Sequence, residues 1–445
     1  MSFIAALVVV SIVACSSDSE IESTATSVAS EPTSAAGVEP ITVDDLLASI
    51  ERGIEEIRGI DTPPPVDHTF VDQAGMRERL NEVLTDPEIL DQIAHEEALF
   101  KLLGVISQDA DLNAIYDSLF GSQVLGLYDP EKEEFFVLGD DQLGAESIDI
   151  EAQLTYAHEY VHRLQDAKFD LEALEDLAMN DDMSLAITAL VEGDATSAQT
   201  QYMLANYDFA ELSSLLESSL AAQEDSPDAP YFIQKSLEFP YTEGAAFVGI
   251  LLQLGEFAAV DAVFVDPPKS SEQVIHAEKY LDQELPIELD IPDDVMGGWT
   301  VQAENVMGEF FLRTWLEALG SNNASAAAAG WGGDVYAVFE QQSLGEIGLV
   351  MTIAWDSSGD STEFFNALTE AMAANDEYSI VGEGIPGVIE SWKVPGGYMV
   401  VSRWASDDVT DRTVIGIGSS IGWAQDLQRA GVFEFQTTTE VTVLD

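Results

Sequence analysis

The chain has 445 residues and an extreme charge balance, because 82 acidic against 16 basic side chains leave a formal net charge of −66. Such a surface repels nucleic acid and anionic lipid, and nucleic acid is excluded as an expected partner. The apolar fraction of 46% is typical of globular proteins, and the length allows two domains. We interpret the dispersed acidic residues as an adaptation of the surface to a saline exterior.

The first 40 residues predict a signal peptide, a lipid anchor and a tether. Residues 1–14 form an apolar run that is shorter than the roughly 20 residues of a membrane-spanning helix and suits a signal peptide. The run ends Ile-Val-Ala-Cys, which resembles a bacterial lipobox, so Cys15, the only cysteine, is the expected lipidation site. Residues 15–40, rich in Ser, Thr, Glu, Ala and Pro, predict a disordered tether. We therefore expect an extracytoplasmic cell-envelope lipoprotein, anchored to the membrane, or a secreted protein, in either case without disulfides.

Residues 41–325 are expected to fold as one mainly helical domain. Apolar residues recur at helical spacing between Thr42 and Arg58, with Thr42 as the N-cap. The sequence predicts further helices at 72–84, 87–105, 112–119, 271–281 and 301–319. Residues 123–138 hold two apolar runs around a polar turn, which predicts a β-hairpin just before the next helix.

That next helix carries an H-E-x-x-H motif, which begins at His158 and ends at His162. Four residues advance about 400° on an α-helix, so the two histidines lie one above the other and both imidazoles can reach one ion. Glu159 lies about 100° around the helix, where it can take a proton from a water bound to the same metal. The motif predicts a zinc site with a general base, and the alternative is a pair of ordinary helix-surface histidines.

A third ligand distinguishes the classes of metallopeptidase that share this motif. Metzincins place a third histidine six residues after the second, but here that residue is Lys168, which excludes the class. Gluzincins take a glutamate from a following helix, and Glu192, in the segment 186–196, is a candidate at thirty residues after His162. The pattern therefore favours the gluzincin arrangement.

Residues 123–356 resemble an uncharacterised group of bacterial, often secreted, zincin-like proteins. Besides His158 to Asp166, the similar stretches are Phe-Asp-Leu at 169–171, Ala-Leu-Val-Glu-Gly-Asp-Ala-Thr at 189–196, Phe-Pro-Tyr-Thr-Glu-Gly at 239–244, Pro-Pro-Lys-Ser-Ser-Glu-Gln-Val-Ile-His at 267–276 and Gly-Trp-Gly-Gly-Asp at 330–334. The resemblance implies a gluzincin-type fold in which His158, His162 and Glu192 bind Zn²⁺ and Glu159 is the base.

Other side chains are candidates for supporting roles around this site. Asp166 and Asp194 are acidic residues close to the ligands in sequence, and each is a candidate to accept a hydrogen bond from a ligating histidine. A hydrolase also needs a donor to the developing oxyanion, and the candidates are Tyr241, His276 and Tyr280.

Residues 326–445 predict a small antiparallel α+β domain, so the fold class expected for the whole chain is α+β. The expected strands lie at 334–340, 348–355, 388–393, 398–404 and 413–417, and the expected helices at 363–372 and 423–430. Short turns at 395–397 and 407–411 favour antiparallel pairing. No catalytic motif is visible in this part of the sequence.

The sequence thus favours an extracytoplasmic zinc metallopeptidase that hydrolyses a peptide or protein substrate with metal-activated water. One alternative is a non-catalytic zincin-like binding or interaction lipoprotein of the cell envelope, with structural zinc. Another is a lipid-anchored solute-binding protein without a metal. A fourth protein ligand would indicate a structural zinc, whereas an open coordination position would indicate a catalytic one.

Overall fold

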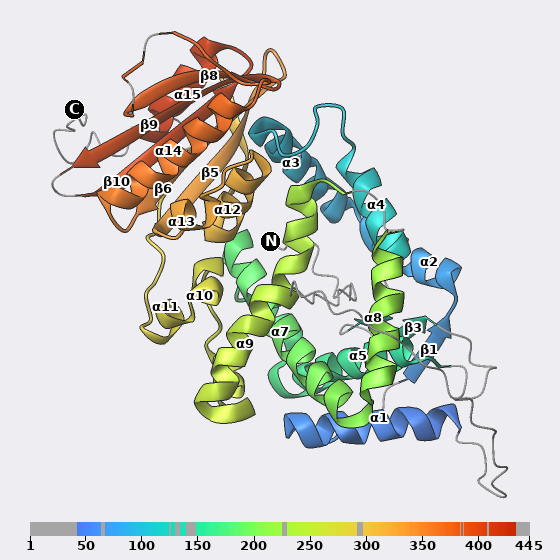
Figure 1. Ribbon diagram of the computed structural model, residues 1–445. Helices are drawn as coiled ribbons and strands as arrows, with labels where there is room; N and C mark the ends of the chain where they lie inside the picture. The colour runs from blue at the N-terminus through green and yellow to red at the C-terminus, as the bar shows by residue number, and fades with distance from the viewer. Residues whose placement is uncertain are drawn as a thin grey trace, which may run out of the picture.

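The computed structural model of the chain describes residues 42–63, 67–123, 126–129, 134–138, 148–224, 229–291, 297–382, 384–385, 387–406 and 409–432. The fold is α+β, as the sequence predicts (Figure 1). Helices dominate the N-terminal and central parts, and a seven-stranded antiparallel sheet dominates the C-terminal part. The predicted signal peptide, Cys15 and the predicted tether lie outside the described residues.

The N-terminal helices follow the periodicity of the sequence. Helix α1 (Val43–Arg58) begins where the Thr42 side chain accepts a hydrogen bond from the Asp45 backbone N–H. It ends at Gly59, whose φ of 68° favours glycine. The next helices are α2 (Gln73–Leu84), α3 (Pro87–Leu103) and α4 (Leu112–Gln123). Each lies within a few residues of its predicted bounds, because apolar spacing along one segment determines which face is buried.

A small three-stranded sheet precedes the helix with the H-E-x-x-H motif. The predicted hairpin is confirmed, since β2 (Gly126–Asp129) and β3 (Glu134–Leu138) pair antiparallel. β1 (Asp67–Val71), which the sequence did not predict, pairs with β3 in parallel and gives the order β1-β3-β2. Both hairpin strands contact α5 (Ile150–Phe169). Within the described residues, β2 is therefore an edge strand beside α5.

Helices α5, α7 (Asp181–Asn206) and α9 (Tyr231–Val265) form the centre of the molecule, and α7 packs against both others. A Cβ on Gly193 of α7 would lie 2.3 Å from the carbonyl oxygen of Gly244 of α9. A Cβ on Gly244 would in turn lie 2.1 Å from the carbonyl oxygen of Ala189. The two helices therefore cross backbone against backbone, and only glycine fits at either position. The connecting helices are α6 (Leu171–Glu175) and α8 (Phe209–Glu224).

Helix α9 is long and apolar enough to cross a membrane by length and composition alone. Non-helical backbone at Gly255 and Glu256 interrupts it, however, and its buried residues pack against α7. The core helices of soluble proteins have the same length and composition, so these two properties do not indicate a membrane span.

The helix predicted at 301–319 is wrong in its first part. The structure has a strand, β4 (Trp299–Asn305), followed by helix α12 (Gly308–Ala318). β4 pairs with a strand that lies about thirty residues later, and Asp334 in that strand accepts a hydrogen bond from the Gly308 N–H at the start of α12. Local spacing could not predict this start, because both interactions come from distant residues.

The helix predicted at 271–281 is also divided. It consists of α10 (Ser271–Ile275) and α11 (Ala277–Leu281), separated by His276, whose ψ of 78° is not helical. The His276 ring lies against α12, with Nε2 3.0 Å from Glu309 Oε1. This contact with a distant side chain accompanies the break.

The seven-stranded sheet has the order β4-β5-β6-β10-β9-β8-β7, and every pair is antiparallel. Its remaining strands are β5 (Trp331–Gln341), β6 (Glu346–Trp355), β7 (Ser379–Ile380), β8 (Ile389–Val394), β9 (Gly397–Ser406) and β10 (Val409–Gly418). The accompanying helices are α13 (Ala324–Ala328), α14 (Ser358–Ala374) and α15 (Ile421–Val432). Because β4 belongs to the sheet, this unit begins before residue 326, where the sequence suggested a boundary.

The two faces of this sheet are covered by different parts of the chain. Along β6, Leu349, Met351 and Ile353 belong to the main hydrophobic core, whereas Val350 packs with Leu427 of α15. This alternation is the period of two expected for a strand buried on both faces. The main core also contains residues of α3, α7 and α12, so it is continuous from the helical part to the sheet.

Residues in the stretches 267–276 and 330–334 connect helices and strands that lie far apart in the sequence. The Ser271 N–H donates to the carboxylate of Asp182 at the start of α7, and the Ser271 hydroxyl accepts from the Phe310 N–H of α12. Asp334, which accepts from the Gly308 N–H, also accepts from Trp331 Nε1 at 2.8 Å. These residues therefore fix α10, α12 and β5 relative to α7.

Candidate metal centre

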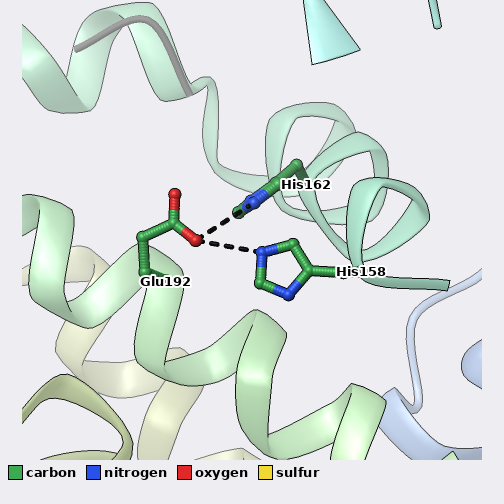
Figure 2. A group of neighbouring side chains, drawn as sticks. All are labelled: His158, His162 and Glu192. Carbon is green, nitrogen blue, oxygen red and sulfur yellow. Dashed lines mark hydrogen bonds and ion pairs between the residues drawn. The ribbon is translucent and has the colours of Figure 1, made fainter. Parts of the chain in front are cut away.

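Three buried side chains converge between α5 and α7. His158 and His162 project from one face of α5 toward Glu192 of α7 (Figure 2). Glu192 Oε2 lies 3.0 Å from His158 Nε2 and 3.5 Å from His162 Nε2. Each of the three residues is at most 2% exposed. The helical spacing of the histidines and the position of Glu192 on the following long helix are as the sequence predicts.

These side chains have the chemistry and spacing of a zinc site. Zn²⁺ is bound tetrahedrally by imidazole nitrogen and carboxylate oxygen at about 2.0–2.1 Å, which places two ligand atoms about 3.3 Å apart. The distances of 3.0 and 3.5 Å from Glu192 Oε2 lie on either side of this value. Within the described part of the chain, the three ligand atoms lie within 4.8 Å of one another, and no fourth His, Cys, Asp or Glu joins them. Two nitrogens, one oxygen and a free position therefore fit the metal.

The charges of these groups also suit a cation. Burial opposes ionisation of Glu192, but the two histidines that face it lower its pKa to about 2. Burial lowers the pKa of His158, which favours the neutral imidazole. Burial has the same effect on His162, but the negative charge of Glu192 outweighs it, and the pKa of His162 is raised. An anionic carboxylate thus lies buried between two rings, where either a proton on His162 or a bound cation would balance its charge.

Each histidine forms a hydrogen bond with a glutamine side chain. Gln165 Oε1 lies 2.8 Å from His162 Nδ1, while Gln165 Nε2 donates to the Val191 carbonyl and to Asp194, both at 2.9 Å. Turning the amide over would bring its oxygen against two acceptors, so Oε1 must face the ring and Nδ1 must carry the proton. The remaining nitrogen, Nε2, then has a lone pair that points toward Glu192. A neutral imidazole with this tautomer is the form that binds a metal.

Gln199 has the corresponding position at His158. Its Nε2 donates to the Leu154 carbonyl at 2.9 Å, and its side chain also forms a hydrogen bond with His158. Because Gln199 lies seven residues after Glu192, both side chains share the face of α7 that meets α5. The two glutamines are functional candidates that sequence reasoning missed, although the i, i+3 spacing of His162 and Gln165 is a signal that could have found one of them.

The acidic candidates for these supporting roles lie elsewhere. Within the described residues, Asp194 accepts hydrogen bonds from Gln165 and from Arg58 at the end of α1. Neither partner is a histidine. Asp166 accepts a hydrogen bond from the Leu171 N–H and lies 3.7 Å from Arg163. The sequence therefore correctly predicted that Asp194 lies near the site. Asp194 contacts Gln165, which in turn contacts His162, and does not contact the histidine directly.

Glu159 and Tyr241 complete the polar surroundings of the site. Glu159 is fully buried on α5, and its negative charge contributes to the raised pKa of His162. The ring of Tyr241, from α9, lies with its centroid 6.2 Å from that of His158. Tyr241 lies about one turn before Gly244, where α9 crosses α7 at Gly193, the residue after Glu192.

The other two oxyanion candidates have different contacts. His276 is 3.0 Å from Glu309, and the Tyr280 hydroxyl donates to the Asp266 carbonyl at 2.8 Å. Among the three candidates from the sequence, the described contacts therefore bring Tyr241 to the metal site and place His276 and Tyr280 in other interactions.

A second group of carboxylates surrounds a lysine. Glu272, Glu284 and Asp356 have oxygens close enough together to hold an ion. Lys279 Nζ lies 2.6, 2.7 and 2.8 Å from these three side chains in turn. An ammonium group thus occupies the place that a metal cation would take. We interpret this cluster as a structural contact that holds α10 and α11 against the C-terminal sheet.

Comparison with known proteins gives one family match. Residues 297–425, which span β4 to the first turns of α15, match a domain of unknown function, DUF8575. The match includes the seven-stranded sheet and none of the residues of the candidate metal centre. No curated protein and no solved structure matches the chain.

Proposed function

We propose that the protein is an extracytoplasmic zinc-dependent metallopeptidase, anchored to the membrane by a lipid on Cys15. His158, His162 and Glu192 are the zinc ligands and Glu159 is the general base. The observation that carries this proposal is the convergence of the three buried ligands at 3.0 and 3.5 Å, from the H-E-x-x-H helix and the following long helix. The substrate is a peptide or protein.

The proposed chemistry divides the work between the metal and the side chains. When bound by three protein ligands, zinc lowers the pKa of a water in its fourth position to about 7 and polarises a carbonyl. The Glu159 carboxylate accepts the proton of the attacking water and returns it to the leaving amine nitrogen. The ring of Tyr241 is the one among the three oxyanion candidates with a described contact to His158, so we assign to its hydroxyl the hydrogen bond to the developing oxyanion.

The proposal includes a zincin-like fold of the gluzincin type. It is supported by a β-hairpin directly before the zinc helix, by the edge strand β2 beside that helix, and by a third ligand from the next long helix. An edge strand in this place offers unpaired backbone groups to an extended substrate, in the manner of β-augmentation. The edge of β2 is thus the proposed site for the substrate backbone.

The low exposure of the three ligands favours a second candidate, a non-catalytic zincin-like binding lipoprotein of the cell envelope. A zinc that no substrate can reach would be structural or part of a binding function. Against this, no fourth His, Cys, Asp or Glu joins the three ligands in the described part of the chain, as a closed structural site would need. The two candidates agree on the metal and differ on hydrolysis.

A single substitution separates these candidates. In Glu159→Gln the zinc content should remain that of the parent, while hydrolysis of a quenched-fluorescence peptide library should fall at least about a hundredfold. The matched control is Glu151→Gln, on the first turn of the same helix, which should retain the parental rate. Undiminished hydrolysis in Glu159→Gln would contradict the mechanism, and a zinc-loaded parent without hydrolysis would favour the binding protein.

A further inference from the structure

Buried polar side chains connect the end of helix α1 to the candidate metal centre. The Arg58 side chain is fully buried, with Nε 2.9 and 3.0 Å from the two carboxylate oxygens of Asp194 on α7. Its Nη2 lies 2.7 Å from Asp261 on α9, and its guanidinium carbon lies 4.7 Å from the centre of the Phe257 ring. Helix α1, which supplies no ligand, therefore ends with a charge in the interior.

Hydrogen bonds lead from Arg58 through Asp194 and Gln165 to His162, and the chemistry of each side chain decides which atom donates and which accepts. An arginine side chain has only donors, so its Nε–H donates to Asp194 Oδ2, while Oδ1 lies 2.9 Å from the same nitrogen as an ion pair. Asp194 Oδ2 also accepts from Gln165 Nε2, which leaves Gln165 Oε1 turned to His162 Nδ1. The Val191 carbonyl accepts from the same Gln165 Nε2, so Asp194, held by Arg58, and this carbonyl together orient the amide toward His162.

This orientation decides whether His162 can bind a metal. Nε2 of His162 lies 3.5 Å from Glu192 Oε2, and a proton on Nε2 would point at that carboxylate and block the lone pair. A proton held on Nδ1 by Gln165 Oε1 keeps the lone pair of Nε2 free. Groups behind a ligating histidine commonly change metal affinity about 10–100-fold when removed.

We propose that Arg58 is a positioning residue of the metal centre, which acts through Asp194 and Gln165 to hold the His162 proton on Nδ1. Helix α1 is accordingly part of the metal centre, although it lies outside the helices that supply ligands (Figure 1). The inference rests on the proposed metal site. It extends that site by a helix that sequence reasoning treated as scaffold.

The test measures Zn²⁺ affinity by competition with a chromogenic chelator on the whole chain. Gln165→Met should weaken binding about 10–100-fold and Arg58→Met about tenfold. If Arg58 acts through Gln165, the double variant should bind no more weakly than Gln165→Met alone. The visible absorption of the Co²⁺-substituted protein, which reports the geometry of the ligands, should change in the same variants.

Controls separate this role from a general effect on folding. Glu51→Ala removes a different contact between α1 and α5, the hydrogen bond from the Tyr156 hydroxyl, and should leave Zn²⁺ affinity within about twofold of the parent. Arg58→Lys keeps the charge but loses the planar fork of donors, so it should bind Zn²⁺ with an affinity between those of Arg58→Met and the parent, which covers the case that Arg58→Met does not fold. Thermal unfolding of the metal-free variants shows how much each substitution destabilises the fold.

Two results would overturn the inference while leaving the metal site in place. One is an affinity of folded Arg58→Met within about twofold of the parent, and the other is a double variant in which the two losses multiply. A parent that binds no Zn²⁺ would instead overturn the proposed function together with the inference.

Discussion

The crossing of α7 and α9 permits a quantitative prediction for Gly193→Ala. The added Cβ would lie 2.3 Å from both the carbonyl carbon and the carbonyl oxygen of Gly244 and 2.9 Å from the Ala245 nitrogen. Ordinary contact begins at about 3.4 Å, so α9 must move by roughly 1 Å, and every atom in its way belongs to the backbone. The displacement would separate Tyr241 from His158.

The energetic effect combines a clash and a propensity. Overpacking costs about 1–3 kcal/mol, and the upper part of that range applies because the backbone cannot rotate away. Alanine gains about 1 kcal/mol over glycine inside a helix. The net destabilisation of Gly193→Ala should therefore be about 1–2 kcal/mol, or a decrease in Tm of about 2–8 °C.

The matched control for this crossing is Gly249→Ala on α9. A Cβ there would meet nothing within 4 Å, so only the helix propensity acts and the Tm should rise slightly. Thermal unfolding followed by circular dichroism measures both variants. A Gly193→Ala variant as stable as Gly249→Ala would refute the close crossing.

Three further predictions concern separate groups. Burial and the nearby Asp181 raise the pKa of Glu96 to about 8 from 4.5, so the folded state binds this proton more tightly than the unfolded state. The contribution of Glu96 to stability should be complete below about pH 4.5 and be lost as the pH rises toward 8. The decrease in Tm across this range should therefore be smaller in Glu96→Gln than in the parent, and an equal decrease would contradict the assignment. Tyr241→Phe should keep zinc and KM but lower kcat about 10²–10³-fold in steady-state assays, and an unchanged kcat would remove Tyr241 from the chemistry. Lys279→Met leaves three carboxylates without their ammonium partner and should lower the free energy of unfolding by about 1–2 kcal/mol, measured by urea unfolding at low salt. An unchanged free energy of unfolding would show that the cluster does not hold these elements together.

The parts of the fold that the sequence predicted are those that depend on local spacing. The N-cap of α1, the hairpin β2–β3 and five strands of the C-terminal sheet, β5, β6, β8, β9 and β10, are each encoded by residues within one segment. β1 was missed because its partner β3 lies more than sixty residues later and pairs with it in parallel. The start of α12 was missed because Asp334, from a later strand, accepts the hydrogen bond that fixes it.

The residues of the candidate site also fall into those that local spacing predicts and those that it does not. The spacing of His158 and His162 follows from one helix, and Glu192 was indicated by comparison with a known motif. The positions of Tyr241 and Arg58 depend on how three helices cross, which no local pattern contains. Glycines at 193 and 244 were visible in the sequence, but their role requires knowing that the two residues are in contact.

The central claim is that the chain binds one zinc ion through His158, His162 and Glu192. The most direct measurement is the metal content, by mass spectrometry, of protein purified without added metal, compared with His158→Ala and Glu192→Ala. We predict one zinc per chain in the parent and little in either variant, because each loses one of three ligands. A parent that holds no metal even after zinc is added, or variants that retain it fully, would contradict this account.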